Sequence, residues 1–167
     1  MTPTPDAFRE AVSRFATGIT VVTCVVDGTD HAMTANAFAS VSLDPLLVLV
    51  CVARESRFGT AVTDTDLWGV SLLPADAEAT SRWFATKGRP LLGQLDRTRH
   101  HRSPAGVAWF DGSLAALECR TTDIHPAGDH DVVIGQVTNL EIPEKVDPEP
   151  LVYYRRRYCS VGVKAEA

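Results

Sequence analysis

The chain has 167 residues, 45% of them hydrophobic and 22% charged, which suits one domain with a substantial core better than two. Its 16 basic and 21 acidic residues give a net charge of −5, which argues against a nucleic-acid-binding protein or one that binds anionic membranes. The sequence has no apolar run near the ~20 residues that span a bilayer, and its first residues lack the basic and apolar regions of a signal peptide. We therefore expect a single domain over residues 1–167 in the cytoplasm.

The first predicted elements are a helix and two strands. Apolar residues at helical spacing predict a short amphipathic helix over residues 6–16, with Asp6 as N-cap and Gly18 just past its end. A β-branched strand is predicted over 19–26, and Asp27-Gly28 forms a hairpin turn that leads into the next strand.

The stretch over residues 32–45 alternates short polar side chains with apolar ones, as a strand with one polar face does. Its polar residues are Thr34, Asn36, Ser40 and Ser42. Short hydroxyl and amide groups leave the backbone accessible, which suits a flat ligand rich in heteroatoms. The alternative is an ordinary half-exposed strand whose polar face meets water. An apolar strand over 46–52 follows.

Ser56 is predicted to cap a short helix over residues 57–64. A serine and Arg57 at a helix N-terminus suit a phosphate, because free N–H groups and a cation converge there. A solvated, capped turn is the alternative. A strand over 67–73 and a helix over 76–86 come next, followed by a polar loop over 88–106.

The second half is predicted to consist mainly of strands. Residues 107–110 and 113–120 are expected to form a hairpin around Asp111-Gly112, with a further strand over 132–140 and a polar-aromatic, basic segment over 151–158. Because the strands do not alternate regularly with helices, the pattern favours an antiparallel barrel with peripheral helices over a doubly wound sheet.

No metal site is expected. The cysteines Cys24, Cys51, Cys119 and Cys159 are far apart and are expected to be reduced thiols. His100-His101 has no third ligand at a suitable spacing. The sequence also lacks a dinucleotide-binding G-x-G-x-x-G, a phosphate-binding loop and a G-x-S-x-G nucleophile elbow.

Residues 32–46 resemble the flavin-binding segment G-x-T-A-N/S-x-F-x-S-V-S-x-x-P-P of the short-chain flavin reductases, with Ala32 and Leu46 replacing the first glycine and the last proline. These are the reductase components of two-component flavin-dependent monooxygenases, including those of aromatic polyketide pathways such as actinorhodin. Gly128-Asp129-His130, with the apolar strand after it, resembles the G-D-H segment of that family. Residues 15–23 and 150–158 resemble its F-x-T-G-V-T-V-V-T entry and its P-L-V-Y-Y-R-x-R/K-Y tail.

The resemblance implies a β-rich α+β fold, the FMN-binding split barrel, which is an antiparallel Greek-key β-barrel with peripheral helices assembled as a homodimer. It implies an NAD(P)H:flavin oxidoreductase that reduces FMN or FAD by hydride transfer from NADH or NADPH and supplies reduced flavin to a partner monooxygenase. Two alternatives remain open: a flavoenzyme that keeps its flavin and acts directly on an organic substrate, and a non-enzymatic flavin- or haem-binding module.

The resemblance also implies roles for individual residues. The flavin would contact Thr34, Ala35, Asn36, Ser40, Val41 and Ser42, with its phosphate at Ser56 and Arg57. His130, beside Asp129, would orient the nicotinamide or assist hydride transfer; the alternative is a turn histidine that hydrogen-bonds locally. Tyr154 would stack on a ring and Arg155 would meet a nucleotide phosphate, unless they belong to a charged edge strand. Cys51 either touches the flavin or fills the core.

Overall fold

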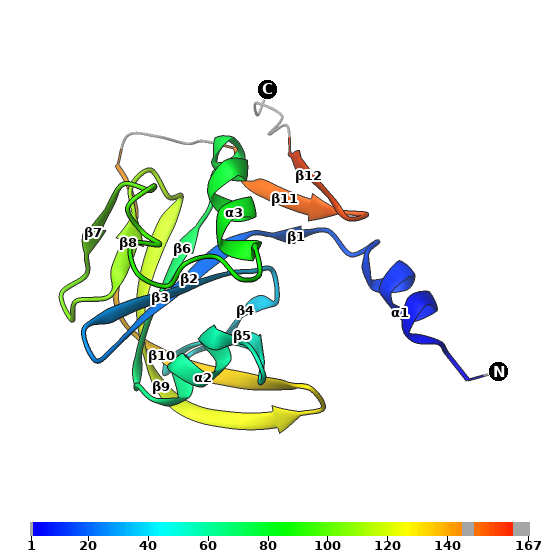
Figure 1. The fold of residues 1–167 in the computed structure, drawn as a ribbon, viewed down its shortest axis with the longest axis horizontal. Helices are drawn as coiled ribbons and strands as arrows, with labels where there is room; N and C mark the ends of the chain where they lie inside the picture. The colour runs from blue at the N-terminus through cyan, green and yellow to red at the C-terminus, as the bar shows by residue number, and fades with distance from the viewer. Residues whose placement is uncertain (1, 145–148, 162–167) are drawn as a thin grey trace.

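A seven-stranded antiparallel sheet forms most of the molecule (Figure 1). The computed structural model describes residues 2–144 and 149–161. In spatial order the strands of the large sheet are β3 (Thr29–Ala35), β2 (Thr20–Val26), β6 (Leu67–Leu72), β9 (Ala115–Ala127), β10 (His130–Glu141), β5 (Leu46–Ala53) and β4 (Phe38–Leu43). The edge strands β3 and β4 are consecutive in the chain, so Asn36 and Ala37 bridge the two edges of a curled sheet. We call this passage from β3 to β4 the seam. The Cys51 N–H donates to the Ala37 carbonyl of the seam at 2.9 Å.

Two small sheets and the helices surround the barrel. The remaining strands are β1 (Thr17–Gly18), β11 (Leu151–Tyr154) and β12 (Arg157–Ser160) in one sheet, and β7 (His100–Arg102) and β8 (Ala108–Phe110) in the other. The helices are α1 (Pro5–Val12), α2 (Arg57–Thr63) and α3 (Glu78–Ala85), and a 3₁₀ turn, η1 (Ala75–Ala77), precedes α3. The expected antiparallel barrel with peripheral helices is confirmed.

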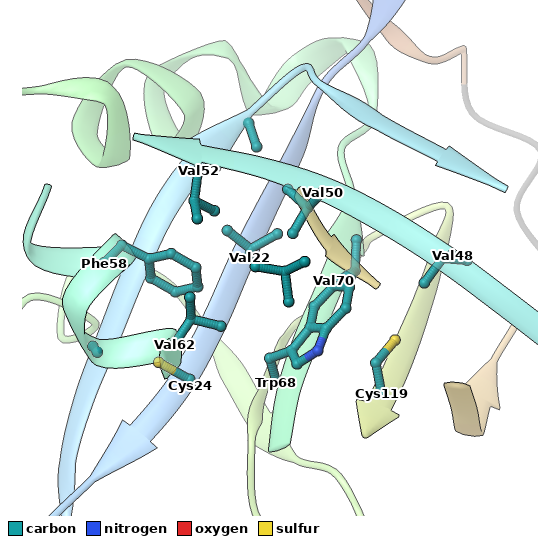
Figure 2. Close-up of a cluster of buried hydrophobic side chains, with 13 residues drawn as sticks. Val22, Cys24, Val48, Val50, Val52, Phe58, Val62, Trp68, Val70 and Cys119 are labelled. Carbon is teal, nitrogen blue, oxygen red and sulfur yellow. The ribbon is translucent and has the colours of Figure 1, made fainter. Parts of the chain in front are cut away.

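Side chains from β2, β5, β6 and α2 meet in the main core (Figure 2). Alternation along β5 buries Val48, Val50 and Val52 on one face, as a strand covered on one side requires. Trp68 of β6 is fully buried, and a Cβ on Gly135 of β10 would lie 2.6 Å from its ring. Glycine at 135 therefore makes room for the indole, and each large apolar side chain in this cluster stabilises the fold by about 1.5–3 kcal/mol.

Two local predictions are confirmed in detail. Asp27 and Gly28 have φ angles of 49° and 73°, the left-handed conformation of the tight hairpin turn between β2 and β3. The Ser56 hydroxyl caps α2 by accepting a hydrogen bond from the Gly59 N–H at 2.9 Å. Both signals depend only on neighbouring residues, so the sequence shows them directly.

Four expectations about elements are wrong. The stretch over 32–45 is not one strand, because β3 ends at Ala35 and β4 begins at Phe38, at the other edge of the sheet. Helix α1 is capped by Thr4 instead of Asp6 and ends at Val12, and Gly18 lies in β1, where it pairs with β11. The region 88–106 is not all loop, because it contains β7. The expected hairpin between 107–110 and 113–120 does not form: β8 pairs with β7, because both edges of β9 are taken by β6 and β10.

In the parts of the chain that the structure describes, no helix is long and apolar enough to cross a membrane.

Candidate functional site

A cleft of about 920 Å³ lies where β3, the start of α2, the loop after α3 and the β9–β10 turn come together. Its apolar walls include Ala32 and Met33 of β3, Phe58 of α2 and Phe84 of α3. These segments are far apart in the sequence, and barrel closure places β3 next to α2 and α3. The cleft is therefore the place where chemistry from several parts of the chain can meet.

Among the described residues that line the cleft, four Arg and Lys side chains stand against the two carboxylates of Glu55 and Asp129. Arg57, Lys87 and Arg89 line it, and none has a carboxylate within 4 Å among residues 2–144 and 149–161. Arg54, by contrast, is paired with Asp131 at 2.7 Å. Unpaired guanidinium groups beside an apolar wall suit an anionic ligand, and a phosphate in particular.

Arg89 is fixed in place by the loop that carries it. Its guanidinium donates to the Thr86 carbonyl at 3.0 Å, to the Gln94 side-chain oxygen at 3.2 Å and to the Ala32 carbonyl of β3. Gln94, which is 2% exposed, in turn donates to the Asp30 carbonyl at 2.6 Å. Burial and the neighbouring charge of Arg57 lower the pKa of Arg89. The protein thus holds two like charges close together in a partly buried site.

Sequence reasoning missed Arg89 and Gln94. Both lie in the region expected to be a polar loop, where arginine and glutamine are ordinary. Sequence reasoning also missed His31 of β3, which lines the cleft as well. Burial, and next the charge of Arg57, lower the pKa of His31. No local pattern marks these residues, because their role depends on the approach of distant segments.

Four of the residues expected to bind the cofactors line the cleft: Thr34, Ser56, Arg57 and Asp129. The Thr34 hydroxyl donates to the Ser81 carbonyl at 2.6 Å, and the Ser56 hydroxyl donates to the Ala53 carbonyl at 2.7 Å. A hydroxyl has one hydrogen to donate. Both groups therefore retain only acceptor capacity, which makes the Arg57 guanidinium a better phosphate ligand than the Ser56 hydroxyl.

The other expected flavin contacts follow the seam where β3 passes to β4, outside the lining of the cleft. Ala35 is buried at the end of β3, and the Asn36 amide donates to the Thr17 hydroxyl at 3.3 Å. On β4, Ser40 and Val41 are exposed, and the Ser42 hydroxyl accepts from the Asp44 N–H. Cys51 is half-buried on β5.

His130 begins β10 at the tip of a hairpin whose turn contains Gly128, with a φ of 66°. Its Nδ1 lies 2.7 Å from an Asp129 carboxylate oxygen, and this hydrogen bond lowers the pKa of Asp129. His130 pairs in register with Ala53, and the Arg54 N–H donates to the Asp129 carbonyl at 3.1 Å. The pair therefore lies beside the segment that enters α2, at the rim of the cleft.

Tyr154 and Arg155 are not brought to the cleft. They line a separate groove between α1 and the β11–β12 hairpin. His101 of the adjacent histidines hydrogen-bonds Asp111 at 2.8 Å and Glu141 at 3.1 Å. Within the described residues, no group of three His, Cys, Asp or Glu side chains is arranged so that it could hold a metal ion.

The residues of the cleft fit a phosphorylated flavin. A flavin mononucleotide combines a flat, largely apolar ring with a dianionic phosphate, and the cleft offers apolar side chains together with Arg57 and Arg89. Burial and the charge of Arg57 lower the pKa of Arg89, and a bound anion would act against both causes. Asp129 belongs to the lining of the cleft, and His130 is the next residue in the chain.

Comparisons with known proteins identify the family of this chain. The family model described as "Flavin reductase like domain" matches residues 12–162. An NADH-dependent flavin reductase of a Rhodococcus species is 39% identical over 95% of this chain and 87% of its own. The reductase component of 4-hydroxyphenylacetate 3-monooxygenase from Thermus thermophilus is 38% identical over 92% and 94%.

The solved structure of an NADH:FAD oxidoreductase from Streptomyces globisporus, in complex with NAD and FAD fragments, is also similar. It has a TM-score of 0.90 and 29% identity, and the match covers 99% of each chain. This likeness extends over nearly the whole split barrel. The chain belongs to the flavin reductase-like family.

Proposed function

We propose that this protein is an NADH-dependent flavin reductase that reduces FMN or FAD and supplies the reduced flavin to a partner monooxygenase. The observation that carries the proposal is the cleft in which Arg57 and Arg89, both without a carboxylate partner among the described residues, face an apolar wall. The names of the relatives, which include reductase components of two-component systems, support the same activity. The proposal specifies NADH instead of NADPH only because the names of the relatives specify NADH.

In the proposed mechanism the arginines bind the flavin phosphate and so position the ring. A bound flavin supplies the electron acceptor, since its ring takes a hydride from the nicotinamide. The network of Arg89, Gln94 and the β3 backbone keeps the phosphate ligand rigid, so little ordering is needed on binding.

His130 is proposed to orient the nicotinamide at the rim of the cleft. Its Nδ1 is held by the Asp129 carboxylate, which fixes the plane of the imidazole and leaves Nε2 to face a ligand. The seam residues Asn36, Ser40 and Ser42, with Ala35 and Val41, are proposed to present backbone and side-chain polar groups along the flavin ring. Cys51 stands on the neighbouring strand β5.

We also propose a single-domain, cytoplasmic protein that works as a homodimer. Helix α1 extends away from the barrel (Figure 1). It buries none of its residues against its own chain, and Phe8 remains 63% exposed. An isolated helix this short is marginal in water. Strand β4 exposes Leu43 at 87%. A second copy covering α1 and β4 would stabilise both, and light scattering would show it as twice the monomer mass.

The first test measures NADH oxidation in air, with and without added FMN, from the decrease in NADH absorbance. A reductase of diffusible flavin gives a rate that depends on added flavin and saturates with it. A yellow protein that turns over without added flavin would support the direct flavoenzyme instead. The absence of oxidation with FMN, FAD or riboflavin, using either NADH or NADPH, would leave a binding module.

A second test concerns His130. His130→Ala is expected to lower NADH-dependent turnover about tenfold or more while FMN affinity stays within about twofold, because the residue contacts the nicotinamide and not the phosphate. His125→Ala, on the exposed part of β9, is the matched control. Unchanged turnover in His130→Ala would remove this residue from the mechanism.

A further inference from the structure

A second groove, of about 600 Å³, lies between the end of α1 and the β11–β12 hairpin. Its lining includes Ser13, Arg14, Arg155 and Arg157, and it shares no residue with the cleft. The Arg155 N–H donates to the Ser13 carbonyl at 2.7 Å, which fastens the hairpin to the segment after α1. Figure 1 shows α1 and this hairpin extending from the same side of the barrel.

The groove concentrates positive charge in an acidic protein. Arg14, Arg155 and Arg157 line it, and Arg156 lies at the hairpin tip. Among the described residues, the carboxylate that lines it belongs to Glu10, 3.4 Å from Arg14. In the described ranges, Arg155, Arg156 and Arg157 have no carboxylate within 4 Å. The chain as a whole carries −5, so this surface differs from the rest of the protein.

The backbone at the hairpin tip is unusual for arginine. Arg155 and Arg156 have φ angles of 48° and 61°, a left-handed conformation that Asn and Gly adopt at lower cost. The β2–β3 hairpin meets the same demand with Asp27-Gly28. Strained positions tend to persist where the side chains are used. Two arginines at these positions therefore point to a function of their charges.

The neighbourhood indicates what kind of partner fits. Each arginine of the hairpin is exposed, so the groove offers several spaced cations and no enclosed phosphate pocket. Exposed apolar groups lie close in the chain: Phe15 is 77% exposed and Tyr154 is 38% exposed. Acidic and apolar side chains on one extended segment would match both features.

We propose that this groove docks an acidic, partly apolar segment of the protein that receives the reduced flavin. The inference rests on the proposed function, because only a reductase of diffusible flavin needs such a receiver. Glu10 lies on the face of α1 opposite Phe8 and Val12. The apolar face of α1 can therefore meet a second copy while the groove stays accessible.

The test measures binding of a short fluorescein-labelled peptide rich in Glu and Leu to the whole protein. The fluorescence anisotropy of the peptide reports the binding. Binding is expected at low salt and should weaken as NaCl is raised. The variant Arg156→Gly/Arg157→Gln should bind the peptide about tenfold more weakly, through the loss of two charges. Glycine suits the left-handed tip, so the hairpin remains folded. NADH oxidation with free FMN should be unchanged.

The control variant Arg99→Gln/Arg120→Gln removes equal charge from residues that do not line the groove. Equal weakening in this control would overturn the proposal, because the peptide would then sense only net charge. Displacement of the peptide by ADP-ribose would assign the groove to a nucleotide. A lower molar mass of the groove variant in light scattering would assign it to a second copy. If wild-type protein fails to oxidise NADH, the proposed function fails whatever the peptide does.

Discussion

Two partly or fully buried charges, Glu118 of β9 and Arg89 of the cleft, are treated in opposite ways by the fold. Glu118 is 1% exposed, and its carboxylate accepts hydrogen bonds of 2.6–2.8 Å from the side chains of Ser103, Thr138 and Asn139 and from the Ala105 N–H. Arg89 donates to neutral oxygens only, and it faces a second cation, Arg57.

The pKa shifts record the difference. Burial alone would raise the pKa of Glu118, but its four donors outweigh burial and lower it, so the charged form is stabilised. Burial and the charge of Arg57 lower the pKa of Arg89, so its charged form is destabilised. The carboxylate of Glu118 finds its hydrogen-bond donors within the chain and stabilises the fold. The guanidinium of Arg89 has no carboxylate partner among the described residues, and we propose that it binds an anion.

The largest effect is expected when the hydrogen-bond network around Glu118 is broken. Glu118→Gln should lower the free energy of unfolding by about 3 kcal/mol, because an amide NH₂ replaces an acceptor and leaves buried donors unsatisfied. Urea unfolding followed by tryptophan fluorescence measures this. Asp123→Asn, exposed on the same strand, should change it by less than about 0.5 kcal/mol. A loss of less than about 1 kcal/mol for Glu118→Gln would mean that the network contributes little.

The same variant gives a pH test with a definite sign. The folded pKa of Glu118 is lower than its ordinary value of 4.5. Its contribution to stability is therefore fully present above pH 4.5 and is lost as pH falls through the folded pKa. The difference in unfolding free energy between wild type and Glu118→Gln should stay constant at neutral pH and shrink in acid. A difference that grew on acidification would contradict the lowered pKa.

Substitution of Arg89 should affect ligand binding more than folding stability. Arg89→Gln is expected to weaken FMN binding about tenfold, through loss of a charged hydrogen bond to phosphate, and to leave riboflavin binding nearly unchanged. Flavin fluorescence quenching measures both constants, and Arg99→Gln is the control outside the cleft. Equal weakening for both flavins would show that Arg89 shapes the cleft without binding phosphate.

The smallest effect probes the repulsion inside the cleft. Arg57→Gln removes one of the causes that lower the pKa of His31, so the folded pKa should move back toward the ordinary value of 6.5. Burial, the larger cause, remains, so the return should be incomplete. NMR titration of the His31 ring measures the change. A pKa that fell further would show that Arg57 does not act on His31 through its charge.

Much of the fold follows from local sequence patterns. Asp27-Gly28 determined a turn, Ser56 determined a helix start, and the apolar run over 46–52 determined a buried strand, because each depends on residues adjacent in the chain. The resemblance in residues 32–46 identified the family, and Arg57 and Asp129 from that reasoning do line the cleft.

Only the tertiary structure decided which segments meet. Arg89 and Gln94 come to the cleft because their loop hydrogen-bonds the β3 backbone, a contact between residues far apart in the sequence. Tyr154 and Arg155 lie in a different groove, although the resemblance to the family's tail suggested a place for them at the cofactors. Strand β8 pairs with β7 because both edges of β9 are already occupied. Pairing and cleft formation depend on how the barrel closes, and closure depends on distant contacts that no local pattern specifies.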